Sequence, residues 1–130
     1  MGNDLNKLAK SILEQNQYMV IGSSDGDGIP WVSPVTYAYD NKLNFYFVSH
    51  TGSKHCLNIN KNKKVSLTIF DSRQLIGEGV GLQIEGIAQK VKIIEMAKAT
   101  AIYFKRKYPF GKFDKIAVVN VALKNLLKKK

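Results

Sequence analysis

Thr51, Ser53, Lys54 and His55 place hydroxyl and basic groups together in the segment richest in candidate chemistry. These small polar residues lead into the pattern of a short helix, which Ser53 or Thr51 is suited to cap. A helix N-terminus carries free N–H groups and a partial positive charge, so the segment predicts a pocket for a phosphate monoester. An ordinary capped helix with exposed basic residues explains the same pattern and is slightly favoured by the residues alone.

A second candidate is the β-prone segment 31–37, which carries Pro34 in its middle. Proline has no N–H, so this strand is expected at a sheet edge or at a bulge. Free backbone groups there would suit a flat polar ligand such as a heteroaromatic ring. A proline that only protects a sheet edge is an equally good interpretation.

Three other signals are rejected as sites. The glycine-rich stretch 77–81 lacks the third glycine of a dinucleotide fingerprint and has no strand-to-helix unit around it. The stretch 25–28 resembles the start of a calcium loop but continues with the wrong residues, so it predicts a turn. His55 and Cys56 point in different directions on a helix, so a buried inert thiol is expected instead of a metal or catalytic pair. We expect no metal site.

Composition limits the class of protein. With 130 residues and 45% hydrophobic content, the chain is expected to form one domain over residues 1–130. A single cysteine, Cys56, excludes an internal disulfide. The absence of a long apolar stretch and of a signal-like start predicts a soluble, cytoplasmic protein with no membrane partner. The net charge of +10 favours anionic ligands, although the lysine-rich end from Lys124 is more simply a solvated tail.

The hydrophobic periodicities predict an antiparallel sheet with helices in the connections. Close turns between the first three strands favour a meander over parallel crossovers, so the fold class is α+β, mainly β, as a small barrel or sandwich. The predicted helices cover 4–16, a short segment from 53, and 93–104, and the six predicted strands cover 18–23, 30–39, 43–48, 64–70, 80–91 and 115–121.

Several ordered stretches resemble the FMN-binding split-barrel family related to pyridoxamine 5'-phosphate oxidase. The similarity runs roughly over 17–121, and the stretch from Gly81 to Pro109 looks like the small bacterial members of the family. It is carried by residues 30–35, 43–47, 52–59, 62–67, 81–88 and 105–109. The resemblance implies a six-stranded antiparallel split β-barrel of Greek-key type with flanking helices, and a homodimer that holds each flavin mononucleotide (FMN) in a cleft between subunits.

The resemblance also assigns cofactor-binding residues. Ser53 and Lys54 fall where the family holds the phosphate, with Thr51 beside them and His55 where a second basic residue often stands. The strand beside the isoalloxazine ring and the end of the next strand supply Val32, Ser33, Pro34, Val35, Val48 and Ser49. The family's oxidases carry a basic residue on the first of these strands and a C-terminal segment that this chain lacks, so vitamin B6 oxidation is not expected.

The leading hypothesis is therefore an FMN-dependent oxidoreductase acting on an unknown small molecule, with no specific nucleic-acid partner and no catalytic acid or base that the residues identify. One alternative is a non-enzymatic basic barrel that binds nucleic acid or another anionic ligand by charge and by stacking on Trp31, Tyr37, Tyr39, Phe45 and Phe47. Against it, Phe45 and Phe47 share one strand face and are expected in the core. A split barrel that holds haem or a deazaflavin is the other alternative.

Overall fold

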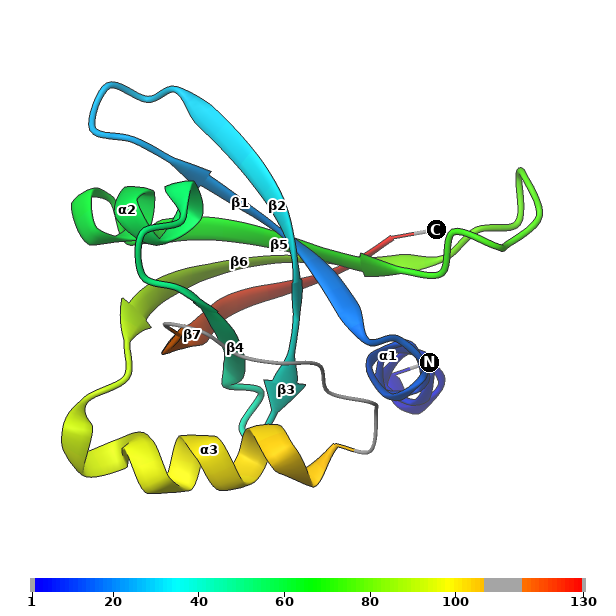
Figure 1. The fold of residues 1–130 in the computed structure, drawn as a ribbon. Coiled ribbons are helices and arrows are strands. Elements are labelled where there is room, and N and C mark those ends of the chain that lie inside the picture. Colours follow the sequence, from blue (N-terminus) through cyan, green and yellow to red (C-terminus); the bar gives the residue numbers. More distant parts are fainter. Residues whose placement is uncertain (1, 107–115, 130) are drawn as a thin grey trace.

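The computed structural model describes residues 2–106 and 116–129 as an antiparallel sheet with three α-helices around it (Figure 1). This confirms the α+β, mainly β class. The elements in chain order are α1 (Gly2–Gln15), β1 (Tyr18–Ser24), β2 (Pro30–Thr36), β3 (Ala38–Tyr39), β4 (Phe45–His50), α2 (Lys54–Lys61), β5 (Lys64–Phe70), β6 (Gly81–Lys90), the 3-10 turn η1 (Ile93–Glu95), α3 (Met96–Lys105) and β7 (Ile116–Lys129).

Seven strands form one sheet in the order β2-β1-β5-β6-β7-β4-β3. The predicted count of six was wrong because the segment 30–39 is two strands, which pair with β1 at one end of the sheet and with β4 at the other. Tyr37 separates them: its N–H donates to the carbonyl of Gln17 at 3.3 Å, outside the sheet ladder, and its buried hydroxyl donates to the carbonyl of Leu13 at 2.7 Å. One stretch of chain thus supplies both end strands of the sheet.

The main core lies between α1 and the inward side chains of the sheet. Alternation along β5 sends Val65, Leu67 and Ile69 inward, as the sequence predicts. Phe45 and Phe47 are completely buried in this core, which confirms their predicted place and removes them from any stacking surface. The outward faces of the strands remain available for a site.

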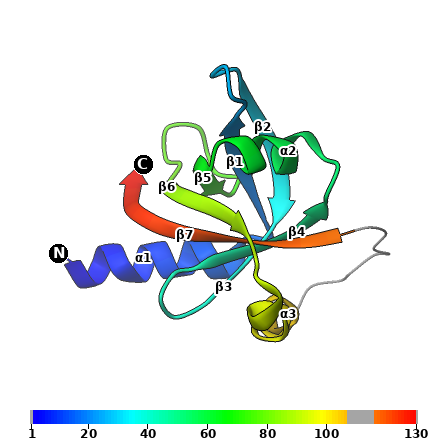
Figure 2. The same cartoon turned by 90° about the vertical axis from the view of Figure 1, so that its left-hand side faces the viewer.

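The three helices occupy different places around the sheet. α2 contacts β1 and β2, whereas α3 contacts β3 and β4 (Figure 2). The helix predicted over 93–104 begins as a 3-10 turn with Ile93 exposed, and α3 itself buries Ala99 and Tyr103. The hydroxyls of Tyr103 and Thr36 are hydrogen-bonded, so a contact with β2 selects the buried face of α3. None of the helices in the described part of the chain is long and apolar enough to span a membrane.

The last strand extends further than predicted. β7 continues to Lys129 and pairs with β6 over most of its length, so the lysine-rich end is strand backbone in the sheet and not a free tail. β6 has a register irregularity between Glu85 and Gly86, as at a β-bulge. A Cβ at Gly81 would lie 3.1 Å from the Phe70 Cβ, so β5 and β6 approach closely there.

Candidate functional site

The start of α2 has the geometry of an anion-binding helix terminus. Ser53 is its N-cap, and the Ser53 hydroxyl accepts a hydrogen bond from the N–H of Cys56 at 3.4 Å. The first helical bond runs from the N–H of Leu57 to the Ser53 carbonyl at 3.0 Å, so the N–H groups of Lys54 and His55 precede the helical ladder. The predicted cap at Ser53 is confirmed, and these N–H groups can bind an anion.

Lys54 connects this helix start to β2. Its Nζ lies 4.2 Å from the centre of the Trp31 ring, a cation–π contact between an exposed ammonium and the half-exposed indole. The positive charge beside Ser53 thus lies against an aromatic side chain of β2. Trp31 joins the phosphate-binding candidate to the face of β2.

His55 is buried and connects two of the predicted hydroxyls. Its Nε2 is hydrogen-bonded to the Ser49 hydroxyl and lies 3.3 Å from the Ser53 hydroxyl, and its ring packs on Phe47 with centroids 5.9 Å apart. Burial lowers the pKa of His55 below its usual 6.5, which favours the neutral ring. His55 therefore orients the hydroxyls of Ser49 and Ser53 and is poorly suited to supply a second positive charge.

We expect the buried His55 to make stability depend on pH below neutrality. The unfolded chain protonates His55 near pH 6.5 and the folded chain only at lower pH, so unfolding is favoured as the pH falls from about 6.5. The stability from this group is fully present above that pH. Urea unfolding between about pH 5 and 8, above the titration of ordinary carboxylates, measures the effect. His55→Gln should flatten this profile, and a profile unaltered by His55→Gln would contradict the assignment.

The predicted residues of β2 do not share one environment. Val32 is 67% exposed, Ser33 is half-buried, Pro34 is exposed, and Val35 is buried in the core. β2 ends the sheet and pairs only with β1 among the described strands, so the edge position predicted from Pro34 is confirmed. Val32 and Pro34 lie on the outward face, opposite Gly22 and Val20 of β1.

Two predicted residues lie apart from the others. The Val48 side chain packs against the small cluster formed by Tyr46, Val91 and Ala99. Thr51 is exposed in the turn before α2, and the cap is Ser53. The structure thus brings together Ser49, Ser53 and His55, places Lys54 beside them, and leaves Val48 and Thr51 outside this group.

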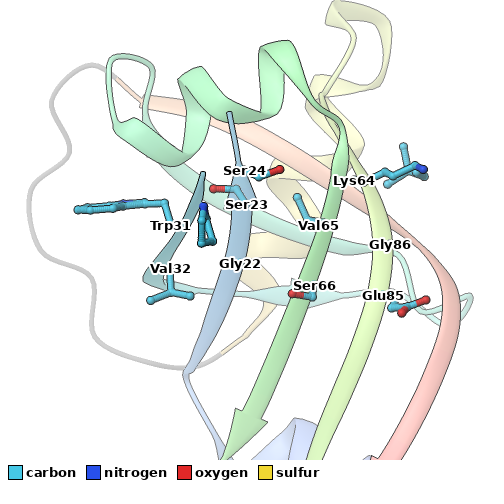
Figure 3. Close-up of a pocket in the computed structure, with 12 residues that line it drawn as sticks. Gly22, Ser23, Ser24, Trp31, Val32, Lys64, Val65, Ser66, Glu85 and Gly86 are labelled. Carbon is cyan, nitrogen blue, oxygen red and sulfur yellow. The ribbon is translucent and has the colours of Figure 1, made fainter. Parts of the chain in front are cut away.

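A cavity of about 580 Å³ opens on the outward side of β1, β2, β5 and β6, within the roughly 300–1,000 Å³ typical of small-molecule sites. Of the predicted cofactor residues only Val32 lines it, and Trp31 borders it as well as contacting Lys54. Its remaining walls were not among the predicted site residues, and most of them are labelled in Figure 3: Gly22, Ser23, Ser24, Lys64, Val65, Ser66, Glu85 and Gly86, together with Pro30 and Ile87.

Gly22 is the sequence signal that could have located this cavity. A glycine in the middle of a strand often marks a close approach, and a Cβ at Gly22 would lie 2.8 Å from the Ser66 hydroxyl. Gly22 is paired with Val32 on β2 and with Ser66 on β5, and these three residues form the floor of the cavity. The position fits a ligand that lies flat against the sheet.

Comparison with known proteins gives a family and a fold. The family model described as pyridoxamine 5'-phosphate oxidase matches residues 5–118. None of the curated proteins matches the chain significantly.

Three solved structures have the same fold. A candidate pyridoxamine 5'-phosphate oxidase from Listeria innocua is 21% identical, with 95% of this chain and 96% of that chain covered and a TM-score of 0.72. An FAD binding protein from Mycobacterium smegmatis is 17% identical, with 95% and 92% covered and a TM-score of 0.73. The heme storage protein HutZ from Vibrio cholerae is 12% identical, with 95% and 93% covered and a TM-score of 0.71. At these identities the likeness concerns the fold alone.

Proposed function

Because the chain belongs to the pyridoxamine 5'-phosphate oxidase family, we propose that it is a split-barrel flavoprotein that binds FMN and transfers electrons to or from a small molecule. The observation that carries the proposal is the start of α2, where the Ser53 cap, the first N–H groups of the helix and Lys54 meet. This is the donor set that a phosphate monoester requires. The same residues carried the resemblance in the sequence.

The donor set fits FMN better than a neutral ligand. Lys54 supplies a positive charge, the N–H groups of Lys54 and His55 supply donors, and His55 orients the Ser49 and Ser53 hydroxyls. No acidic side chain lies in the first turn of α2, so nothing in that turn opposes an anion. A phosphate bound there would lie within reach of Trp31.

The isoalloxazine ring is placed in the cavity beside Trp31. Trp31 and Val32 offer apolar surface, while Ser24 and Ser66 offer hydroxyls, a mixture that suits a flat ring with polar edges. The cavity is open along the sheet face. We therefore propose that a second copy of the chain covers the bound ring, in a homodimer with one FMN in each shared cleft. Sedimentation of the flavin-loaded protein measures this: a monomer that holds FMN would contradict the shared cleft.

Bound FMN supplies hydride or single-electron chemistry, and the protein supplies binding and orientation. Lys54 and the α2 start hold the phosphate end, and the outward residues of β1, β2 and β5 set the place of the ring. Ser24, Lys64, Ser66 and Glu85 are polar residues of the lining that can contact a substrate beside it. The substrate class is a small molecule, since the cavity has limited volume beyond the ring.

The test uses the only tryptophan of the chain as a reporter. FMN added to the protein should quench Trp31 fluorescence, because bound flavin would lie close to an indole held by Lys54. The titration should saturate at one FMN per chain, and FMN should also raise the melting temperature, because a ligand that binds only the folded state stabilises it.

The absorption spectrum of the purified protein identifies the cofactor. Flavin bands would support the proposal, whereas a haem or deazaflavin spectrum, or quenching by riboflavin as strong as that by FMN, would overturn it. The second comparison isolates the phosphate, the only group by which the two flavins differ.

A further inference from the structure

The two ends of α2 contact different parts of the candidate site. Ser53 and Lys54 lie at its start, and Asn62 is the residue that caps its end. The Asn62 side chain donates a hydrogen bond from Nδ2 to the Ser24 hydroxyl at 2.8 Å, and Ser24 lines the cavity on the sheet. Both side chains are half-buried, so this contact lies at the border between the helix and the cavity.

The direction of this hydrogen bond is fixed by the backbone of β5. The N–H of Lys64 donates to Asn62 Oδ1 at 3.1 Å, and a backbone N–H cannot accept. The amide oxygen of Asn62 must therefore face Lys64, which leaves the amide nitrogen for Ser24. The backbone N–H of Asn62 donates to the Asn58 carbonyl at 2.7 Å, so the helix holds the residue as well. Ser24 consequently accepts a hydrogen bond and keeps its own proton to donate.

The Ser24 proton has no acceptor among the residues that the structure describes. Ser24 belongs to the outward side of β1, in the alternation that also sends Gly22 outward. A hydroxyl that already accepts from an amide and borders a cavity is a preorganised hydrogen-bond donor. The group that it suits is an acceptor oxygen of a bound molecule.

A neighbouring pair shows what the same chemistry does inside the protein. Asn58, one turn earlier on α2, donates from Nδ2 to the Ser23 hydroxyl at 3.2 Å, and both residues are buried. This pair joins α2 to β1, so attachment of the helix does not rest on Asn62 and Ser24 alone. The half-buried pair at the cavity is therefore available to a ligand.

The charges of the lining favour an oxygen at the α2 end of the cavity. Gly22 is opposite Ser66, so Ser24 and Lys64, each two residues farther on, occupy the next row of the sheet. Glu85, the acidic residue of the lining, is opposite Ser66 and thus lies two residues, or about 7 Å, away along the strands. Figure 3 shows Ser24 and Lys64 nearer α2 than Ser66 and Glu85. A carbonyl or carboxylate oxygen in this row would meet a donor and a positive charge.

We propose that the α2 end of the cavity is a subsite for a carbonyl or carboxylate oxygen of a small molecule. Ser24 donates to this oxygen, and Asn62 is the positioning residue that fixes Ser24 as a donor. The subsite goes beyond the proposed flavin function, because it states the chemistry of the molecule that lies beside the ring: a small carboxylic acid, ketone or amide. It does not depend on flavin, since all of its groups belong to the chain.

The test is a titration of the full chain, without added flavin, with benzoate, benzamide and benzylamine, followed by two-dimensional amide NMR. These spectra record the Ser24 backbone amide and the Asn62 side-chain amide directly. Benzoate and benzamide should shift both signals saturably, and benzylamine, an ammonium with the same ring, should not. Tighter binding of benzoate would identify the oxygen as a carboxylate's and equal affinities as a carbonyl's, and either result supports the subsite.

Two variants test the direction of the hydrogen bond. Ser24→Ala removes the donor and should weaken benzoate about tenfold and benzamide about threefold, as expected for a charged and a neutral acceptor. Asn62→Asp keeps an acceptor for the Lys64 N–H but also accepts the Ser24 proton, so it should cause similar losses. The matched control is Asn60→Asp, which adds the same charge at an exposed position of α2 and should leave both affinities within about twofold.

The double variant separates positioning from charge and from folding. If Asn62 acts through Ser24, Asn62→Asp should add little to the loss of benzamide affinity in a Ser24→Ala background. Benzamide is neutral, so charge repulsion does not enter this comparison, and circular dichroism checks that each variant is folded. Fully additive losses, an equal loss for Asn60→Asp, benzylamine binding as tight as that of benzoate, or no saturable shift with either oxygen ligand would overturn the proposal. FMN binding is measured separately, so its failure is distinguishable from these outcomes.

Discussion

Replacing Lys54 by alanine is expected to weaken FMN binding about 10- to 100-fold, because a charge-assisted hydrogen bond is worth roughly 1.5–3 kcal/mol and each 1.4 kcal/mol is tenfold. Lys54 is the cation at the start of α2, next to the Ser53 cap, and its Nζ lies over Trp31. Quenching of Trp31 fluorescence by FMN gives the dissociation constant.

Two controls separate the phosphate from general charge. Lys61→Ala removes an exposed lysine from the opposite end of the same helix and should leave FMN affinity within about twofold of the wild type, as expected for a weakly coupled surface charge. Lys54→Ala should also leave the affinity for riboflavin, which lacks the phosphate, nearly unchanged. Equal losses in the two lysine variants, or an equal loss for riboflavin, would remove Lys54 from the phosphate site.

Replacing Arg106 by alanine is expected to destabilise the fold by about 3 kcal/mol and to lower the melting temperature by about 10 °C. Its guanidinium donates to the carbonyls of Tyr37 at 2.9 Å, Leu13 at 3.0 Å, Glu14 at 3.4 Å and Asn16 at 2.7 Å. α1 has no basic residue in its own last turn, so Arg106 supplies the cation at its C-terminus.

Arg106 also stacks on the aromatic side chains around the break between β2 and β3, 4.5 Å from the Tyr37 ring centre and 5.6 Å from that of Tyr39. Burial raises the pKa of Tyr37 to about 12, so its hydroxyl remains a donor to the Leu13 carbonyl at neutral pH. Loss of Arg106 therefore loosens the end of α1 and the point where the chain crosses between the two ends of the sheet.

Urea and thermal unfolding measure the effect of Arg106→Ala. Arg73→Ala is the matched control, because the Arg73 side chain is 85% exposed and its pair with Asp71 is of the surface kind worth about 0–1 kcal/mol. Arg106→Lys should give an intermediate loss, since an ammonium keeps the charge without the planar fork. If Arg106→Ala and Arg73→Ala had equal free energies of unfolding, the hydrogen bonds of Arg106 would contribute nothing measurable to stability.

The elements set by local patterns were predictable. A serine before a polar helix start marks a cap, alternation marks the buried face of β5, and a proline in a strand marks a sheet edge, and each of these holds in the structure. Each signal depends on a few neighbouring residues and on backbone chemistry that is the same in any fold.

The elements set by distant partners were not predictable. Alternation over 30–39 gives no sign that Tyr37 leaves the ladder, since its partners Gln17 and Leu13 lie far back in the chain. The face of α3 depends on the contact between Tyr103 and Thr36, and the extent of β7 depends on a long ladder with β6. Packing between segments that are remote in sequence decides these features, and the hydrophobic periodicity of one segment contains no information about its distant partners.

The candidate site divides in the same way. The sequence by itself determined the helix cap at Ser53, the cation beside it and the family to which they point, because cap, charge and spacing are local properties. Only the tertiary structure decided that Trp31 lies over Lys54, that His55 is buried against Ser49, and that Gly22 and Ser66 leave a cavity open on the sheet. Those three arrangements join residues from separate strands and a helix, and strand pairing and core packing create such neighbours only when the chain is folded.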